Sequence, residues 1–299
     1  MKREELLALP SACVRAVLDT DAYNEIDDQF AIVYAMLAPE RIELEAIYAA
    51  PFLNKRSSSA ADGMEKSYDE IQRVLGLLCA ADQVPTFRGA EAFLVDHPAP
   101  LATDATEDLI TRARQRDKGP LYVMAIAAIT NVATAILLAP DIIDNIVVVW
   151  LGGHADYWAH NGEFNFQQDV PAVKAVLESG VVIFRMPCVP VADHLQLTIY
   201  ELEHYLSGKG PLADYLCQIF RNYREHEGAW TKVIWDIAVV AWLVNHDWVP
   251  SKLAPAPFMQ ADNSWSISSI NSIIRTAIQV YRDPVYTDLF KRIITYSAR

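Results

Sequence analysis

The stretch VLDTDAYNEIDDQF, residues Val17–Phe30, places five carboxylates within ten residues near the start of the chain. These are Asp19, Asp21, Glu25, Asp27 and Asp28. The apolar run before them predicts a strand over 14–19. The following residues predict a helix over 27–38 with an acidic first turn, which suits the positive end of the helix dipole. The stretch therefore indicates a strand, an acidic loop and the start of a helix.

The same alternation of β-rich runs and helical patterns continues as far as Pro190. Further strands are predicted over 42–50, 120–127, 145–153 and 181–186, with helices over 64–80, 131–139 and 170–179. After Pro190 we expect helical segments over 200–207, 211–226 and 233–245, a strand pair over 266–281 and a helix over 284–296. Continuous apolar strands separated by helices are typical of a parallel sheet covered on both faces. We predict one α/β domain, residues 1–299, with an open, mostly parallel (mixed) central sheet flanked by helices.

Composition narrows the class of partner. The net charge is −13, from 25 basic and 38 acidic residues, which argues against a nucleic-acid partner because such proteins usually present a basic face. No run approaches the ~20 apolar residues of a membrane helix, and the N-terminus lacks a secretory apolar region. The four cysteines form no CxxC pair, which favours reduced thiols over a zinc site. We expect a cytoplasmic protein that binds a small molecule and neither nucleic acid nor membrane.

The acidic loop itself points to a cation. Ligands of open α/β sheets bind beyond the carboxyl ends of the strands, where Asp19 and Asp21 are expected. Asp27 and Asp28 open the next helix, so all four carboxylates should converge on one rim. Carboxylates that close repel one another unless a proton or a cation intervenes. Ca²⁺ or Mg²⁺ would suit this oxygen-rich set, and a set of helix caps and solvated acids is the alternative.

The loop and four later segments resemble a known family. DTDAYNEIDDQFAI resembles the DxDPGxDDxxAI signature of the inosine-uridine type nucleoside hydrolases, with two extra residues and without the Pro-Gly. Further similar segments follow in the family's order: AAITNVATAILLAP (127–140), VVVWLGGHA (147–155), GEFNFQQDVPAV (162–173) and VIWDIAVVAWL (233–243). The resemblance implies a nucleoside hydrolase-like variant of the Rossmann-type fold. It also implies a homo-dimer or homo-tetramer.

The resemblance implies one Ca²⁺ at the bottom of the pocket. Its protein ligands would be the Asp21 and Asp28 carboxylates, the Thr130 backbone carbonyl and the Asp236 carboxylate, with water and two sugar hydroxyls completing the set. Mixed carboxylate and carbonyl oxygens are a sensible calcium set. For Thr130 alone, a plain helix N-cap is the competing interpretation.

The implied reaction is hydrolysis of the N-glycosidic bond of a ribonucleoside to free base and ribose. Its transition state resembles an oxocarbenium ion, which nearby negative charge stabilises. Asp21 would act as general base on a Ca²⁺-bound water, and Asp27 would accept a hydrogen bond from a ribose hydroxyl. Glu163 and Asn165 would hold the rest of the sugar. The competing interpretation of Glu163 is a surface acid in a loop.

The base side differs from many family members, which carry a His before the final Asp. Trp235 occupies that position and resembles the purine-preferring branch, where an aromatic ring stacks on the base. A core role at helical spacing from Trp242 competes with this interpretation. Trp158 is a second stacking candidate, and His154 is a candidate for contact with the base. We therefore expect a purine ribonucleoside as substrate.

Two departures leave other functions open. The family's AGN after the second strand is AAP here (49–51), so Asn54 or Lys55 would have to replace the missing Asn in part. A riboside- or sugar-binding relative with altered catalysis is therefore one alternative. The other is a phosphatase with an aspartate nucleophile, which also begins with a strand and DxD. The expected Thr or Val after the second Asp is absent, which disfavours it.

Overall fold

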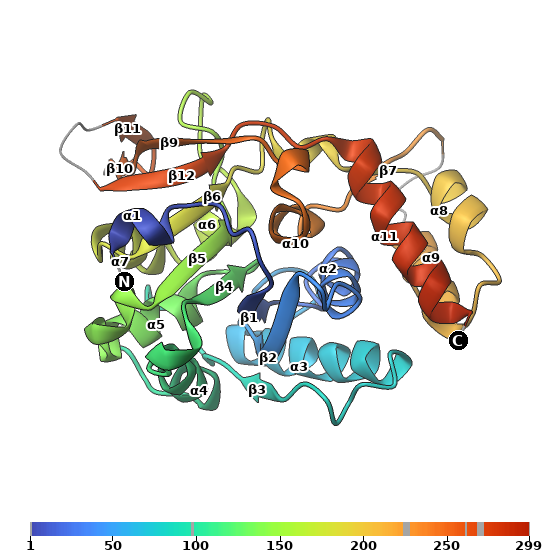
Figure 1. Cartoon of the computed structure of the whole chain (residues 1–299), viewed down its shortest axis with the longest axis horizontal. Coiled ribbons are helices and arrows are strands. Elements are labelled where there is room, and N and C mark those ends of the chain that lie inside the picture. The colour runs from blue at the N-terminus through green and yellow to red at the C-terminus, as the bar shows by residue number, and fades with distance from the viewer. Residues whose placement is uncertain (1, 97–98, 224–227, 261, 268–271, 299) are drawn as a thin grey trace.

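The computed structural model describes residues 2–96, 99–223, 228–260, 262–267 and 272–298. Within these ranges eight strands form one central sheet in the order β3-β2-β1-β4-β5-β6-β12-β9 (Figure 1). Neighbouring strands are parallel, except that β9 runs antiparallel to β12. The mostly parallel, mixed sheet expected from the sequence is confirmed.

The strands are short and mostly buried. Those of the central sheet are β1 (Val14–Thr20), β2 (Ile42–Ala49), β3 (Thr86–Arg88), β4 (Leu121–Ala125), β5 (Ile146–Leu151), β6 (Val182–Met186), β9 (Ser251–Pro255) and β12 (Ile273–Ala277). Two small antiparallel pairs lie outside it: β7 (Gln196–Leu197) with β8 (Lys232–Val233), and β10 (Pro257–Met259) with β11 (Trp265–Ile267). The all-buried pattern of β1, β4, β5 and β6 explains why their sequences are mostly apolar, although β1 includes Arg15 and Asp19 and β6 includes Arg185.

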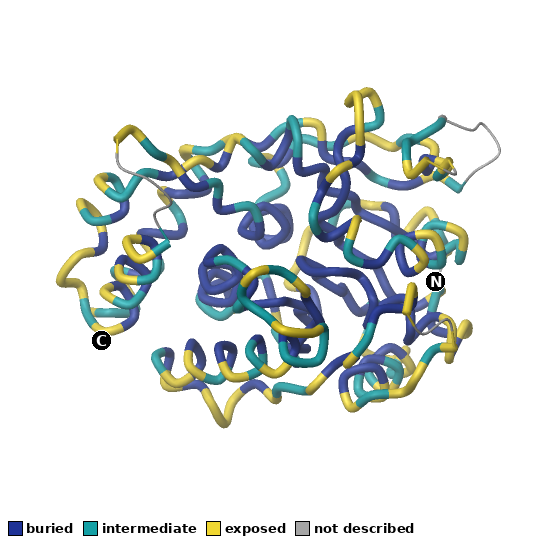
Figure 2. The backbone as a smooth tube through the Cα atoms, turned by 180° about the vertical axis from the view of Figure 1, so that it is seen from behind, coloured by how far each residue is buried: buried dark blue, intermediate teal, exposed yellow. Residues whose placement is uncertain are grey.

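Helices cover both faces of the sheet and create two apolar clusters. One contains residues of α2 (Asp28–Met36), α3 (Ala60–Leu77), α8 (Ile199–Leu206), α9 (Pro211–Asn222), α10 (Ile237–Val244) and α11 (Arg282–Ser297). The other contains residues of α4 (Asp104–Ala113), α5 (Thr130–Leu138) and α7 (Val170–Glu178). The shorter helices are α1 (Arg3–Leu6) and α6 (Phe164–Gln168), with 3₁₀ turns at Arg116–Lys118, Pro140–Asp144, Ala192–His194 and His246–Trp248. Figure 2 shows the buried strands at the centre and exposed stretches in the outer helices and loops.

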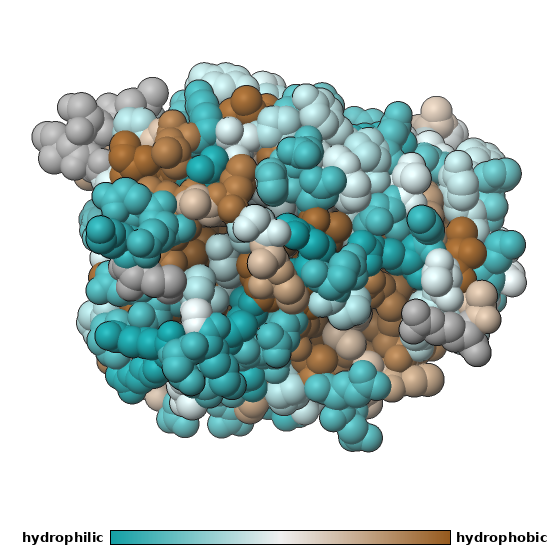
Figure 3. Space-filling view, in the orientation of Figure 1, coloured by the Kyte–Doolittle hydropathy of each residue, from teal (hydrophilic) through white to brown (hydrophobic). Residues whose placement is uncertain are grey.

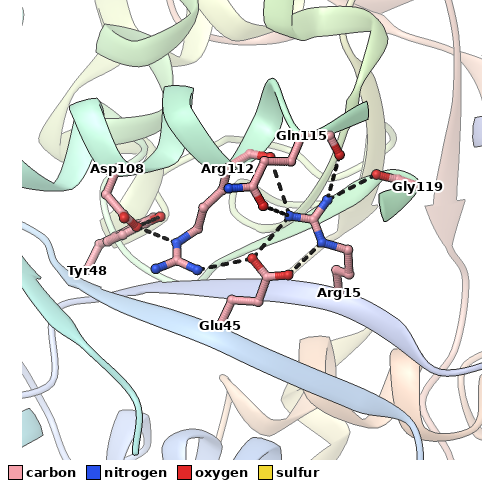
Figure 4. A network of polar contacts seen from close by, with 7 residues as sticks. All are labelled: Arg15, Glu45, Tyr48, Asp108, Arg112, Gln115 and Gly119. Carbon is pink, nitrogen blue, oxygen red and sulfur yellow. Dashed lines mark hydrogen bonds and ion pairs between the residues drawn. The ribbon is translucent and has the colours of Figure 1, made fainter. Parts of the chain in front are cut away.

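A polar network ties α4 to the first two strands of the sheet (Figure 4). The Arg15 Nε lies 2.5 Å from Glu45 Oε1, and Arg112 Nη1 lies 3.1 Å from Glu45 Oε2. Arg112 also pairs with Asp108, which accepts a 2.8 Å hydrogen bond from the Tyr48 hydroxyl. Arg15 and Glu45 are both largely buried, and each of their charges has a partner. This network is a structural connection between helix and sheet.

The segments after Pro190 depart from the sequence prediction. Helix α10, predicted to begin at residue 233, begins at Ile237, because Lys232 and Val233 pair with β7. The predicted strand pair over 266–281 is wrong as a pair: β11 pairs with β10, and β12 enters the main sheet between β6 and β9. The predicted helix over 211–226 ends at Asn222, and residues 224–227, like 268–271, lie outside the described ranges.

Several elements have no counterpart in the sequence prediction, among them the three-residue edge strand β3, the helix α4 and the antiparallel edge strand β9. Thr103 caps α4 and its side chain accepts from the Thr106 backbone N–H, a local signal that marks the start of this helix. Among the described helices, none combines the length and apolar character needed to cross a membrane. Hydrophilic side chains cover much of the face in Figure 3, and hydrophobic ones gather in smaller areas between them.

Candidate active site

A cavity of about 570 Å³ opens where the direction of strand order reverses. From β1 the chain proceeds outward to β2 and β3, and then returns to β4 on the other side of β1. Such a switch point leaves a crevice beyond the carboxyl ends of the two strands, where ligands of open α/β sheets bind. The lining includes Asp21 from the loop after β1, Ile126 after β4 and Leu151 at the end of β5.

Four buried aspartates form the floor of this cavity, and we call them the acid cup: Asp21, Asp27, Asp28 and Asp236. Asp27 is the N-cap of α2 and Asp236 the N-cap of α10, so two helix N-termini point their positive ends at the cup. Carboxylate oxygens of Asp27, Asp28 and Asp236 lie within 4.8 Å of one another. Three of the four carboxylates expected to converge on one rim, Asp21, Asp27 and Asp28, therefore line one cavity together with Asp236. The expectation is wrong for Asp19, which lies outside this lining.

Among the described residues, too few cationic side chains lie near the acid cup to neutralise its four carboxylates. Burial, and then repulsion among the cup acids, raises the pKa of Asp28 to about 7 and that of Asp21 and Asp236 well above the ordinary range. Burial raises the pKa of Asp27 to about 6, although Lys232 opposes the shift. The Oδ2 atom of Asp21 is buried and has no hydrogen-bond partner in the described chain. Such groups call for a cation or protons.

One lysine that sequence reasoning missed reaches the edge of the cup. Lys232 in β8 is buried, forms an ion pair with Glu25 and places its Nζ 3.8 Å from Asp27 Oδ1. Burial lowers the pKa of Lys232, but the nearby Asp27 and Glu25 carboxylates raise it by more than burial lowers it, so the ammonium stays charged. The other oxygen of Asp27 accepts a 3.1 Å hydrogen bond from the Trp235 backbone N–H. The position of Asp27 is thus determined from the segment that precedes α10.

Glu163 and Asn165 build the opposite wall. Glu163 is buried and caps α6: its carboxylate accepts three 2.8 Å hydrogen bonds from the backbone N–H groups of Gly153, Asn165 and Phe166. Glu163 is therefore an organiser of its loop and not a solvated surface acid. The Asn165 amide nitrogen donates to the carbonyls of Ile126 (3.1 Å) and Leu151 (3.2 Å). It ties this wall to the ends of β4 and β5.

The segment after β4 contributes Ile126 to the cavity, while Thr130 lies outside its lining. The Thr130 hydroxyl donates a 2.7 Å hydrogen bond to Asp169, at the junction of α6 and α7. Next to it, the Asn131 amide donates a 2.7 Å bond to Asp19 Oδ1. Asp19 is likewise outside the lining, and burial raises its pKa to about 7. The Asn131–Asp19 bond therefore holds α5 against β1, and the Thr130–Asp169 bond joins α5 to the junction of α6 and α7.

The geometry agrees with comparisons to known proteins. The sequence profile of the inosine-uridine preferring nucleoside hydrolases matches residues 16–280. The chain belongs to this family. Pyrimidine-specific ribonucleoside hydrolase RihA of Enterobacter sp. (strain 638) is 26% identical over 259 residues, which cover 77% of this chain and 78% of that protein.

Two solved structures share the fold of this nucleoside hydrolase family member. A plant nucleoside hydrolase superposes with a TM-score of 0.74 at 16% identity, covering 95% of this chain and 99% of that one. The purine-preferring ribonucleoside hydrolase from Gardnerella vaginalis gives a TM-score of 0.72 at 18% identity, with the same coverage. The relatives' names thus include both pyrimidine and purine enzymes. The phosphatase alternative finds no support among them.

Trp235 and His154, the residues expected to contact the base, both line the cavity. Trp235 is half-buried at the cavity, whereas Trp242 is buried in the core beside Phe184, so helical spacing does not put the two tryptophans in one environment. His154 accepts a 3.4 Å hydrogen bond on Nδ1 from the Val189 N–H, and burial lowers its pKa. Trp158 lies outside the lining, 41% exposed, and packs edge-on against His154.

The lengthened first loop also reaches the cavity. Asn24 and Glu25 line it, together with Asn54 and Lys55 from the loop after β2. The Asn54 amide donates a 2.5 Å hydrogen bond to Asn24 Oδ1, so the two loops are joined at the rim. The lengthened first loop and the loop after β2 are therefore in direct contact, and Asn54 lines the cavity beside Asn24.

Proposed function

We propose that this protein hydrolyses the N-glycosidic bond of a ribonucleoside, with Ca²⁺ as cofactor, to give a free base and ribose. The observation that carries the proposal is the unpartnered, buried Oδ2 of Asp21, set among three further buried aspartates at the switch point of the sheet. A neutral protein interior does not keep four such groups together without a cationic ligand. Membership of the nucleoside hydrolase family supports the reaction class.

The donor set fits calcium. Asp28 and Asp236 offer carboxylate oxygens that lie within 4.8 Å of each other and of Asp27. Asp21 lines the same cavity, burial and then the charges of Asp28 and Asp27 raise its pKa, and we assign it as a further ligand. We assign the backbone ligand to the Ile126 carbonyl, because Ile126 lines the cavity and Thr130 does not. Hard oxygen ligands in a flexible arrangement suit Ca²⁺ better than Zn²⁺. When bound, Ca²⁺ would lower the pKa of a water and neutralise the cup.

The chain's own residues would then carry the chemistry. Asp21 takes a proton from the water whose oxygen bonds to C1′, while the C1′–N bond breaks and its electron pair moves to the base nitrogen. The base nitrogen gains a proton from solvent, and Asp21 afterwards releases its proton to solvent. Positive charge develops on the sugar ring in the transition state, and the surrounding carboxylates stabilise it. Asp27 accepts a hydrogen bond from a ribose hydroxyl. Glu163 and Asn165 position the sugar from the opposite wall.

We further propose a purine as the leaving base. Trp235 presents part of its ring to the cavity, and stacking on a two-ring base buries more aromatic surface than stacking on a pyrimidine. His154, held through Nδ1 by the Val189 N–H, is left with Nε2 as the nitrogen that can donate to the base. Trp158 would contribute indirectly, by packing on His154.

The test is release of reducing sugar from a panel of purine and pyrimidine ribonucleosides, with added Ca²⁺ and with a chelator. We expect chelator-sensitive release that is faster for purines, and its loss in Asp21→Asn. An exposed acid, Asp117→Asn, is the matched control. No release from any ribonucleoside with Ca²⁺ present would refute the proposal, and faster release from pyrimidines would refute its purine part.

A second candidate is a riboside-binding protein without turnover. The observation that favours it is Lys232, whose ammonium already supplies one positive charge at the edge of the cup, 3.8 Å from Asp27. Tight binding of a ribonucleoside that is recovered unhydrolysed would establish this candidate instead.

A further inference from the structure

A second and larger cavity adjoins the candidate active site. It has a volume of about 1010 Å³, and its lining shares Lys55, Arg56 and Tyr223 with the lining of the acid-cup cavity. A ligand seated over the acid cup can therefore continue past these shared residues into the second cavity. Ribose and a base do not account for this additional space, so the chemistry of its lining indicates which further group of a ligand it would accept.

The charge of the second cavity is opposite to that of the protein. Its charged lining residues are Lys55, Arg56, Arg73 and Glu70, although the whole chain carries a net charge of −13. Glu70 is buried and already engaged, by the Tyr215 hydroxyl, by the Gln29 amide and, at 3.4 Å, by Arg73. In the described part of the chain, neither Lys55 nor Arg56 forms an ion pair with a carboxylate. Lys55 and Arg56 are thus available to bind an anionic group of a ligand.

The loop after β2 holds Arg56 in a defined position. Asn54 Oδ1 accepts a 2.7 Å hydrogen bond from the Arg56 backbone N–H. The Arg56 guanidinium lies over the Tyr23 ring, 4.3 Å from its centroid, and donates a 2.9 Å bond to the Glu25 carbonyl. Its remaining N–H groups keep the planar fork that binds phosphate oxygens in pairs. The arginine is therefore pre-organised by Tyr23 and Glu25 of the first loop.

The second cavity is also lined by a neutral hydrogen-bond acceptor, the side-chain oxygen of Gln29, that has no donor in the described structure. Gln29, at 2% exposure, lines it, and its Oε1 has no hydrogen-bond partner in the described structure. Its amide nitrogen is occupied by the Ala22 carbonyl at 2.7 Å and by Glu70 at 3.1 Å. A buried acceptor without a donor costs free energy, so a hydroxyl of a ligand or a water would stabilise it. The lining thus offers cations for an anion and an acceptor for a hydroxyl.

We propose that the substrate is a phosphorylated riboside, with its ribose over the acid cup and its phosphate against Lys55 and Arg56. The proposal rests on the proposed function, since it names the substrate class of that same site. Two unpaired cations match one phosphate group and not a polyanion, which the acidic surface of the whole protein would repel. The first loop would then serve to place Arg56, through the Tyr23 ring and the Glu25 carbonyl.

The test is calorimetric titration of ribose 5-phosphate and of ribose, each in the presence of Ca²⁺. We expect ribose 5-phosphate to bind at least tenfold more tightly than ribose to the wild type. This advantage should disappear in the double variant Lys55→Gln/Arg56→Gln and persist in Lys174→Gln, a matched loss of an exposed cation on α7. The advantage should also decrease as salt is added, because the contact is ionic.

Equal affinity of the wild type for the two ligands would overturn the proposal, and so would an advantage that persists in the double variant. Hydrolysis distinguishes this failure from failure of the proposed function. In parallel, kcat/KM is measured for inosine and inosine 5′-monophosphate, and we expect the phosphorylated substrate to be favoured in the wild type only. Binding of ribose 5-phosphate without release of sugar from either compound would refute the proposed hydrolysis and leave the phosphate site standing.

Discussion

Removal and addition of Ca²⁺ should change the stability of this protein strongly and with a defined pH dependence. In the absence of a cation, burial and mutual repulsion disfavour ionisation of the acid cup, and Asp28 alone has its pKa raised from 3.8 to about 7. Such a shift corresponds to a cost on the order of 4 kcal/mol when the group is forced to ionise. Because the folded-state pKa is raised, this cost is absent below the unfolded pKa near 4, grows as pH rises from about 4 to about 7, and is complete above about 7.

The expected size of the calcium effect follows from mass action. Ca²⁺ at about 100 times its dissociation constant stabilises the folded state by about 2.7 kcal/mol. For a chain of 299 residues the entropy of unfolding is about 0.6 kcal/mol/K, so the melting temperature should rise by about 4 °C. Binding needs ionised carboxylates, so the rise should be larger at about pH 8 than at about pH 5. Differential scanning calorimetry with chelator and with Ca²⁺ measures both values.

Asp28→Asn provides the sharper form of this experiment. The amide keeps the shape of the side chain and an oxygen that can accept from the Thr20 hydroxyl, but it removes one charge from the cup. We expect the metal-free variant to melt higher than the metal-free wild type at about pH 8, and to lose most of the response to Ca²⁺. Asp117→Asn, at an exposed position, should leave both quantities unchanged. A full calcium response in Asp28→Asn, or metal-free stability that rises over this pH range, would refute the electrostatic reasoning.

Three further changes test other parts of the site. Trp235→Ala should raise KM for a purine ribonucleoside about tenfold, because aromatic stacking on a base contributes about 1–3 kcal/mol, and Trp235→Phe should retain most of the binding. An unchanged KM for Trp235→Ala in steady-state kinetics would exclude stacking. Lys232→Met should destabilise the metal-free protein by about 3 kcal/mol in urea unfolding, because Asp27 loses its cationic partner, and it should enlarge the stabilisation by Ca²⁺. An unchanged stabilisation by Ca²⁺ would contradict the view that Lys232 and the metal compensate the same carboxylates. Glu45→Gln should cost about 3 kcal/mol by removing the partner of Arg15 while kcat stays at the wild-type value, and a large drop in kcat would mean that the network acts on the site.

Local sequence patterns determined most of the sheet. Strands β1, β2, β4, β5 and β6 were predictable because a buried parallel strand needs a continuous apolar run, and the helices between them carry their own periodicity. The same patterns located the acid cup in outline, since residues at the carboxyl ends of parallel strands meet on one edge. The order of later segments along the chain, compared with a known family, added Asp236.

Tertiary structure alone decided the rest, because these features depend on contacts between residues far apart in the chain. No local pattern states that Lys232 reaches Glu25, that Ile126 and not Thr130 lines the cavity, or that β12 inserts between β6 and β9. Glu163 reads as a loop acid in sequence and becomes a buried helix cap only when the Gly153 N–H is brought to it. Hydrophobic periodicity specifies which side of an element is buried, whereas the partner that buries it is chosen by packing of the whole chain.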